Sequence, residues 1–303
     1  MMPDPRSPLE SPVWFEPLRS PAWLLPRVRD DAPRVVFAAE PWDEQGVDGA
    51  GRDLRLGLPL YLAEAARFST NARPLALRGQ VGPDRSVPEA AATVRTAVAP
   101  GGQRSIRVRV VDPAGGMMDE IVRDARNEDE LGGAMQLLPH AVTQALAPGG
   151  VRPIWNSLYT LPSQAALASY VRGLHACLRL SDGPPSGSVE AEEVAAWRTD
   201  VRSTLGALGT LATRTAEPFP ALVFFGAVLA AYDARAQVVG ESRLPANARC
   251  TAATDPLDPV YAMTALVMRV FGDFDTSERR IDRLRTGADP AVLPWLARVQ
   301  EVT

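Results

Sequence analysis

The hydrophobic pattern between residues 33 and 149 changes period repeatedly, which is typical of a domain that mixes strands and helices. Arg34–Ala39 is continuously apolar after its first residue and predicts a buried strand. The apolar positions from Leu54 to Phe68 recur at helical spacing and predict an amphipathic helix. We expect a second strand over Pro74–Val81 and a second helix over Val87–Val98.

The end of this region predicts a hairpin followed by a helix. Apolar and arginine side chains alternate over residues 106–110, so one face of this strand enters the core and the other shows arginine to solvent. Asp112–Gly116 is a turn signal, and Met117–Val122 is the expected returning strand. A helical stripe over residues 131–145 closes the domain, and Pro139 is expected to bend it.

Four features of this region resemble those of a known family. Arg34–Trp42, the amphipathic helix after it, and Ser105–Gly116 ahead of the helix start Glu128–Leu131 resemble the TolB amino-terminal-like domain, over about 115 residues. The resemblance implies an α/β fold, often joined to tetratricopeptide helices in bacterial signalling and envelope proteins. The matching features are structural patterns, and the family has no catalytic residues to carry over. Pro139 departs from the family's usual last helix.

The hydrophobic pattern of the second half of the chain predicts helices. One stripe runs from Leu167 to Leu178 and ends at the turn residues Gly183–Gly187. A longer helix is predicted from Val194 to Leu211, with Ser188 as its cap. The 14 apolar residues Phe219–Tyr232 are too few for a typical membrane span and predict a buried helix.

The last third suggests a helical repeat. Asp255-Pro256 recurs as Asp289-Pro290 after 34 residues, which is the tetratricopeptide period. Apolar positions between the two copies fit two helices that meet at a turn near Gly272. We therefore expect two or three helix pairs, stacked to offer a surface to a peptide or helix.

The first 43 residues contain nine prolines and a short tandem repeat. Ser11–Pro17 is followed nine positions later by Ser20–Pro26, and each copy holds a tryptophan at its fourth position. Closely spaced prolines limit the segment to extended chain or single turns. Its large apolar side chains need a groove, either on a partner or on the chain's own domain, and the sequence leaves both open. The candidate partner-binding residues are Trp14, Phe15, Leu18, Trp23, Leu24 and Leu25.

Composition removes several kinds of chemistry. All 32 basic residues are arginine, so neither a Schiff-base lysine nor a phosphate-binding P-loop lysine is available. This absence is most simply explained by a GC-rich bacterial genome. A net charge of −4 with mixed signs argues against general nucleic-acid binding, and the arginine groups at 104–109 and 279–285 read as solvated faces. Two cysteines at distant positions indicate neither a disulfide framework nor a zinc site.

The remaining candidates for catalysis are few. His175 and Cys177 are two positions apart, so on a helix they point to different sides and form a poor nucleophile and base. His140 has no acidic neighbour in sequence that suggests a role. The start of a calcium loop at Asp273 fails because Glu278 replaces its glycine and Leu284 its glutamate.

These patterns lead to one main hypothesis and two others. We expect a proline-rich extended arm (1–32), an α+β or α/β domain (33–149) and an all-α, tetratricopeptide-like domain (150–303). The expected function is a non-catalytic interaction or assembly subunit that binds a protein partner or itself, without cofactor, metal, nucleic acid or transmembrane segment. The others are a regulatory module that binds a small molecule between the domains and, least favoured, a carboxylate-based hydrolase. A cytoplasmic location is expected because no signal peptide is recognisable; peripheral attachment to a membrane complex stays open.

Overall fold

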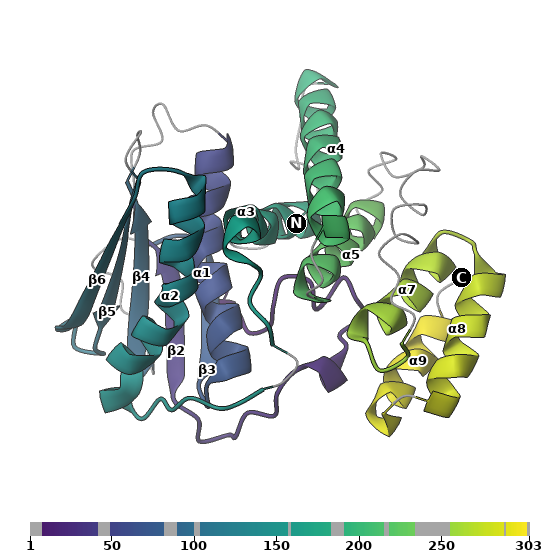
Figure 1. The fold of residues 1–303 in the computed structure, drawn as a ribbon, viewed down its shortest axis with the longest axis horizontal. Coiled ribbons are helices and arrows are strands. Elements are labelled where there is room, and N and C mark those ends of the chain that lie inside the picture. The colour runs from purple at the N-terminus through teal and green to yellow at the C-terminus, as the bar shows by residue number, and fades with distance from the viewer. Residues whose placement is uncertain are drawn as a thin grey trace. The chain divides into compact units, whose positions relative to one another are not determined.

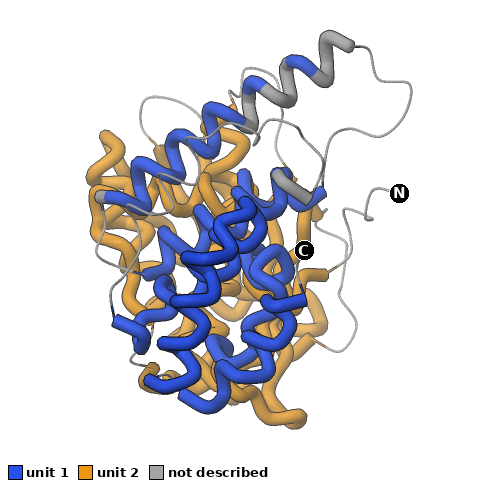
Figure 2. The backbone as a smooth tube through the Cα atoms, turned by 90° about the vertical axis from the view of Figure 1, so that its right-hand side faces the viewer, with its two compact units in different colours: residues 1–2, 13–25, 176–303 blue, residues 3–12, 26–175 orange. Residues whose placement is uncertain are grey.

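The computed structural model describes residues 8–41, 49–81, 90–99, 104–156, 159–182, 191–214, 218–233, 255–287 and 289–301. These residues form two compact units, coloured separately in Figure 2. One, here called unit 2, comprises residues 3–12 and 26–175. Unit 1 comprises residues 1–2, 13–25 and 176–303. The mixed α/β class expected from the sequence is present, whereas the helical-repeat arrangement stays a prediction.

Unit 2 is built on a six-stranded mixed sheet in the order β1-β3-β2-β4-β5-β6 (Figure 1). Strand β2 lies parallel to β3 and β4, and β4, β5 and β6 form an antiparallel meander. The strands are β1 (Pro8–Leu9), β2 (Arg34–Ala39), β3 (Arg73–Gln80), β4 (Ala92–Val98), β5 (Arg104–Val111) and β6 (Met117–Ala125).

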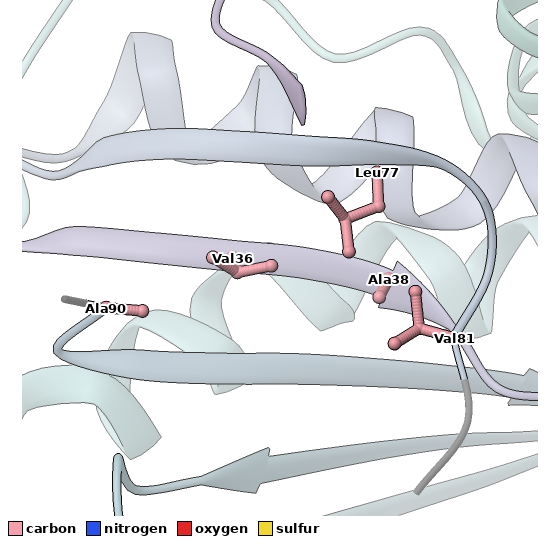
Figure 3. Packing of buried hydrophobic residues seen from close by; sticks show 5 residues of the cluster. All are labelled: Val36, Ala38, Leu77, Val81 and Ala90. Carbon is pink, nitrogen blue, oxygen red and sulfur yellow. The ribbon is translucent and has the colours of Figure 1, made fainter. Parts of the chain in front are cut away.

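Helices cover one face of this sheet. Helix α1 (Gly49–Ser69) packs against β2, β3 and β4, and α2 (Glu128–Leu146) packs against β5 and β6 (Figure 1). Because successive strand residues point to opposite faces, Val94, Val108 and Ile121 enter this core while their neighbours do not. A small second cluster, Val36, Ala38, Leu77, Val81 and Ala90, is shown in Figure 3.

The predicted helix over Val87–Val98 is wrong. Residues 92–98 form β4, and their burial alternates strictly, with even-numbered side chains buried and odd-numbered ones half-buried. Thr93, Val94 and Thr96 are β-branched residues, which pack well on a pleated surface. This two-residue period is the signal that the sequence interpretation missed.

Two hydrogen-bond arrangements explain local features of α2. Asn127 caps its start by accepting a bond from the Glu130 amide at 2.8 Å, while the Glu130 carboxylate accepts the Arg126 amide at 2.8 Å. Pro139 has no N–H to give to the carbonyl one turn earlier, that of Met135. The Tyr61 hydroxyl donates to that carbonyl at 3.4 Å, so α1 supplies the missing donor.

Helix α3 (Gln164–Asp182) packs unusually closely on α1 and α2. A side-chain carbon at Gly57 would lie 2.0 Å from the Val171 carbonyl oxygen, and one at Gly132 would lie 1.9 Å from the Gln164 carbonyl oxygen. Only glycine leaves room for this approach. The two compact units divide after His175, within α3, and the predicted domain boundary at residue 149 stays a prediction.

Unit 1 contains α4 (Ala191–Arg214), α5 (Pro218–Asp233), α7 (Pro259–Val270), α8 (Phe274–Gly287) and α9 (Leu293–Gln300). Residues 219–231 of α5 are buried on every side, as expected for a central helix. Helix α5 packs against α4 and α7, and α7 packs against α8 and α9. The predicted cap at Ser188 lies outside the described residues.

Candidate protein-interaction site

The segment Val13–Leu25 lies within the predicted proline-rich arm and is called the arm from here on. It belongs to unit 1, although the residues on both sides of it belong to unit 2. Residues 13–19 form turns, and Ala22–Leu24 form a single 3-10 turn. Between them Arg19 and Ser20 have positive φ angles of 59° and 51°. The amides of these two residues bond back to the carbonyls of Glu16 and Phe15 at 2.9 Å, which closes the turn.

The first tryptophan of the tandem repeat is an anchor in the core of unit 1. Trp14 is fully buried, and its ring meets that of Phe219 edge to face, with centroids 6.1 Å apart. A side-chain carbon at Gly226 would lie 2.8 Å from the Trp14 Cβ atom. The glycine in α5 therefore provides the space that the arm occupies.

The second tryptophan contacts a different helix. Trp23 meets Trp295 of α9 edge to face at 6.3 Å. The Trp295 indole nitrogen donates to the Leu18 carbonyl at 2.9 Å, and the Arg298 guanidinium donates to the Ser20 carbonyl at 3.0 Å. The two copies of the repeat thus provide one aromatic ring to α5 and one to α9.

The thiol of Cys177 provides a further contact to the arm. Its sulfur lies 3.9 Å from the Val13 carbonyl oxygen, within the range of a weak S–H donor. The cysteine is buried. Three side chains of unit 1, from Cys177, Trp295 and Arg298, therefore donate to main-chain carbonyls of the arm.

The six predicted partner-binding residues are all at least partly buried in the folded chain. Trp14, Leu18 and Leu24 are buried, and Phe15, Trp23 and Leu25 are half-buried. We call the site that receives the arm the arm seat; it is formed by Phe219, Gly226, Trp295, Arg298 and Cys177. While the arm is bound there, these six side chains serve the chain's own fold. Their role toward a partner stays a prediction.

Sequence reasoning missed the receiving side of this contact. The sequence pattern places Phe219 and Gly226 only in a buried helix, and it suggests no role for Trp295 or Arg298. The bond between Trp295 and Leu18 joins residues 277 positions apart. Nothing local in a sequence reports such a distant pairing; the one available hint is that two tryptophans in a proline-rich segment need aromatic or apolar partners.

The two histidines considered for catalysis lie in different surroundings. The His175 Nδ1 atom lies 2.7 Å from an Asp53 carboxylate oxygen, so its partner comes from α1 and not from Cys177. His140 is exposed on α2. Within the described ranges no group of three metal-ligating side chains occurs.

A buried carboxylate joins α1 to α3. Glu64 is buried, and the Tyr170 hydroxyl donates to it. Burial, together with the negative charge of Glu64, raises the pKa of Tyr61, Tyr159 and Tyr170 above the ordinary tyrosine value. The Glu64–Tyr170 hydrogen bond is a contact between two helices.

The arginines at 104, 107 and 109 are ion-paired with carboxylates. Arg109 lies 3.4 Å from Glu40 and 3.2 Å from Glu120, and Arg107 lies 3.7 Å from Glu120. In α8, Arg280 lies over the Tyr261 ring at 4.5 Å. These contacts agree with the interpretation of solvated protein faces.

Comparison of the chain with models of protein families, with curated proteins and with solved structures finds no match. Among the helices that the structure describes, none has the length and apolar character needed to cross a bilayer.

Proposed function

We propose that this chain is a non-catalytic interaction subunit whose helical unit binds extended, tryptophan-containing segments. The observation that supports this proposal is the arm seat, where α5 and α9 each receive one tryptophan of a tandem repeat. In this chain the arm itself is the bound segment. The proposed partner is a protein that presents an equivalent Pro- and Trp-rich segment.

The chemistry of the seat suits such a partner. Tryptophan is the residue type most enriched among interface hot spots, and an edge-to-face ring contact adds about 0.5–1.5 kcal/mol to burial of its surface. A proline-stiffened segment loses less conformational freedom when it binds. The hydrogen-bond donors of the arm seat are the side chains of Cys177, Trp295 and Arg298. They donate to main-chain carbonyls, which any segment can supply.

The test replaces residues 13–25 by a Gly/Ser linker of equal length, which keeps β1 and the covalent connection. A fluorescent peptide of residues 11–26 is then titrated into this linker variant, and its anisotropy is recorded. We expect saturable binding, and a rise in the melting temperature of the linker variant when peptide is present.

Matched peptides decide whether binding uses the seat. Replacing Trp14 by Ala in the peptide should weaken binding at least about tenfold, whereas replacing the exposed Ala22 by Ser should leave it unchanged. Equal binding of the three peptides, or no binding to a linker variant that keeps its helical circular dichroism, would contradict the proposal.

A further inference from the structure

Strand β6 ends the sheet, and its outer edge faces away from β5 (Figure 1). It is nine residues long, and Met117 and Val122 on it are 62% and 43% exposed. A long edge strand is a template on which another strand can add. No strand in the described part of the chain pairs with this edge.

Two backbone groups of this edge are satisfied by neighbouring side chains. The Glu120 amide donates to the Asp119 carboxylate at 2.8 Å, and the Val122 carbonyl accepts from the Arg123 guanidinium at 2.9 Å. In an antiparallel pair, alternate residues direct their N–H and C=O groups toward the partner strand. Glu120 and Val122 therefore direct theirs outward, while Asp119, Ile121 and Arg123 bond to β5.

We propose that β6 pairs antiparallel with β6 of a second copy of this chain, in a register centred on Ile121. In this register Ile121 opposes its own copy, and Glu120 opposes Val122 of the second copy. Asp119 then opposes Arg123 on both sides of the two-fold axis. The outward amide of Glu120 and the outward carbonyl of Val122 bond to each other across the new strand pair.

Charge selects this register from its neighbours. In the dimer the sheets of the two copies join into one continuous sheet. If the helix-covered face is to lie on the same side in both copies, opposing residues must come from the same face of β6. A register centred on Glu120 would place that carboxylate against itself, and one centred on Val122 would place Glu120 against Asp124. Centring on Ile121 opposes no two carboxylates and forms two Asp–Arg pairs.

The side chains that cover the edge in the single chain are the ones that pair in the dimer. Asp119 and Arg123 exchange a contact with their own backbone for a contact with the second copy, while the freed backbone groups bond to one another. Pairs of opposite charge across two strands are favourable by about 0.2–1 kcal/mol each, and like charges are unfavourable. A contact limited to one strand edge is small, so we expect a dissociation constant of about micromolar or weaker.

The test measures the mass of the full chain in solution by sedimentation over about 1–300 μM, a range set by that expected affinity. The wild-type chain should change from monomer to dimer over this range. The single variants Asp119→Arg and Arg123→Asp should each raise the dissociation constant at least about tenfold, because two like-charge contacts replace two attractive ones. The double variant Asp119→Arg/Arg123→Asp restores both pairs and should restore the dimer.

Two further variants separate pairing from folding. Val122→Pro removes only an outward N–H, which an edge strand tolerates, so it should abolish the dimer at an unchanged melting temperature. Asp124→Asn changes a charge that opposes Met118 and should leave the dimer intact. A wild-type chain that is monomeric throughout, or a dimer that survives Val122→Pro and both single reversals, would overturn the proposal. This proposal does not depend on the proposed function, so a failure of the peptide to bind at the arm seat would leave the expected dimer unchanged.

Discussion

The arm seat in unit 1 and the contact between α1 and α3 in unit 2 both join segments that are far apart in sequence, but by different means. The seat uses aromatic rings and donors to main-chain carbonyls. The α1–α3 contact uses buried pairs of specific side chains, Glu64 with Tyr170 and Asp53 with His175.

This difference bears on which contact can exchange. Main-chain carbonyls are common to every segment, so under the proposed function the arm seat selects mainly for tryptophans at the right spacing. In the α1–α3 contact each polar group depends on one defined partner, and an unpaired buried group costs about 1–3 kcal/mol. We therefore expect α1 and α3 to stay together and the arm to be the replaceable part.

The largest expected effect tests the seat at its two anchors. Trp14→Ala should lower the free energy of unfolding by about 3–5 kcal/mol, because it empties a fully enclosed site beside Phe219. Trp23→Ala should cost less, since that side chain is only half-buried. Urea unfolding followed by circular dichroism measures both; equal losses would show that the two anchors are equivalent.

The next effect tests the buried phenols of unit 2. The pKa values of Tyr61, Tyr159 and Tyr170 are raised by burial, so the folded protein keeps these protons when the unfolded chain loses them. Their contribution to stability is complete below about pH 10 and falls as the pH rises further, by about 1.4 kcal/mol per pH unit for each phenol.

The chain has no lysine to titrate in this range, so tyrosines and its two cysteines are the main side chains that lose a proton there, and phenolate absorbance separates the two kinds. Urea unfolding between pH 8 and 12, with phenolate absorbance recorded in parallel, measures the slope. The slope is set by the number of protons released on unfolding, and Tyr170→Phe should lower that number by about one. Full phenolate absorbance near pH 10 in a still-folded protein would contradict the burial of these groups.

A smaller effect tests the close approach of α1 and α3. Gly57→Ala places a carbon 2.0 Å from the Val171 carbonyl oxygen, so the helices must shift, at a cost of about 1–3 kcal/mol. The control is Gly206→Ala in α4, where the added carbon meets nothing within 4 Å and should stabilise by about 0.5–1 kcal/mol. Thermal unfolding of both variants compares them; a neutral Gly57→Ala would show that this contact is loose.

The smallest effect concerns Glu128 at the start of α2. Burial raises its pKa, but Arg172 and Arg104 more than offset this, so the folded pKa lies below the ordinary value. The stabilisation is complete above about pH 4.3 and is lost as the pH falls through the folded pKa. Glu128→Gln should flatten the acid limb of the stability curve by less than about 1 kcal/mol, since both partners are partly exposed.

Elements with a strong local period could be predicted from the sequence, and contacts between distant segments could not. The strand Arg34–Ala39, the first helix and the hairpin around Asp112–Gly116 are present as expected. Residues 92–98 form a strand that the sequence interpretation misses, because Thr96 and Ala97 interrupt its short apolar–polar alternation. For the arm, proline spacing predicted turns and extended chain, but its seat depends on Trp295, whose position follows only from the folded chain.

The most direct measurement of the central claim uses Cys177 as a reporter of the arm seat. In a Cys250→Ser background, the rate of maleimide labelling is compared for the intact chain, the linker variant, and the linker variant with peptide 11–26. We expect Cys177 to be protected in the intact chain, reactive in the linker variant and protected again when peptide is added. Labelling of the linker variant that is equally fast with and without the peptide would contradict the account.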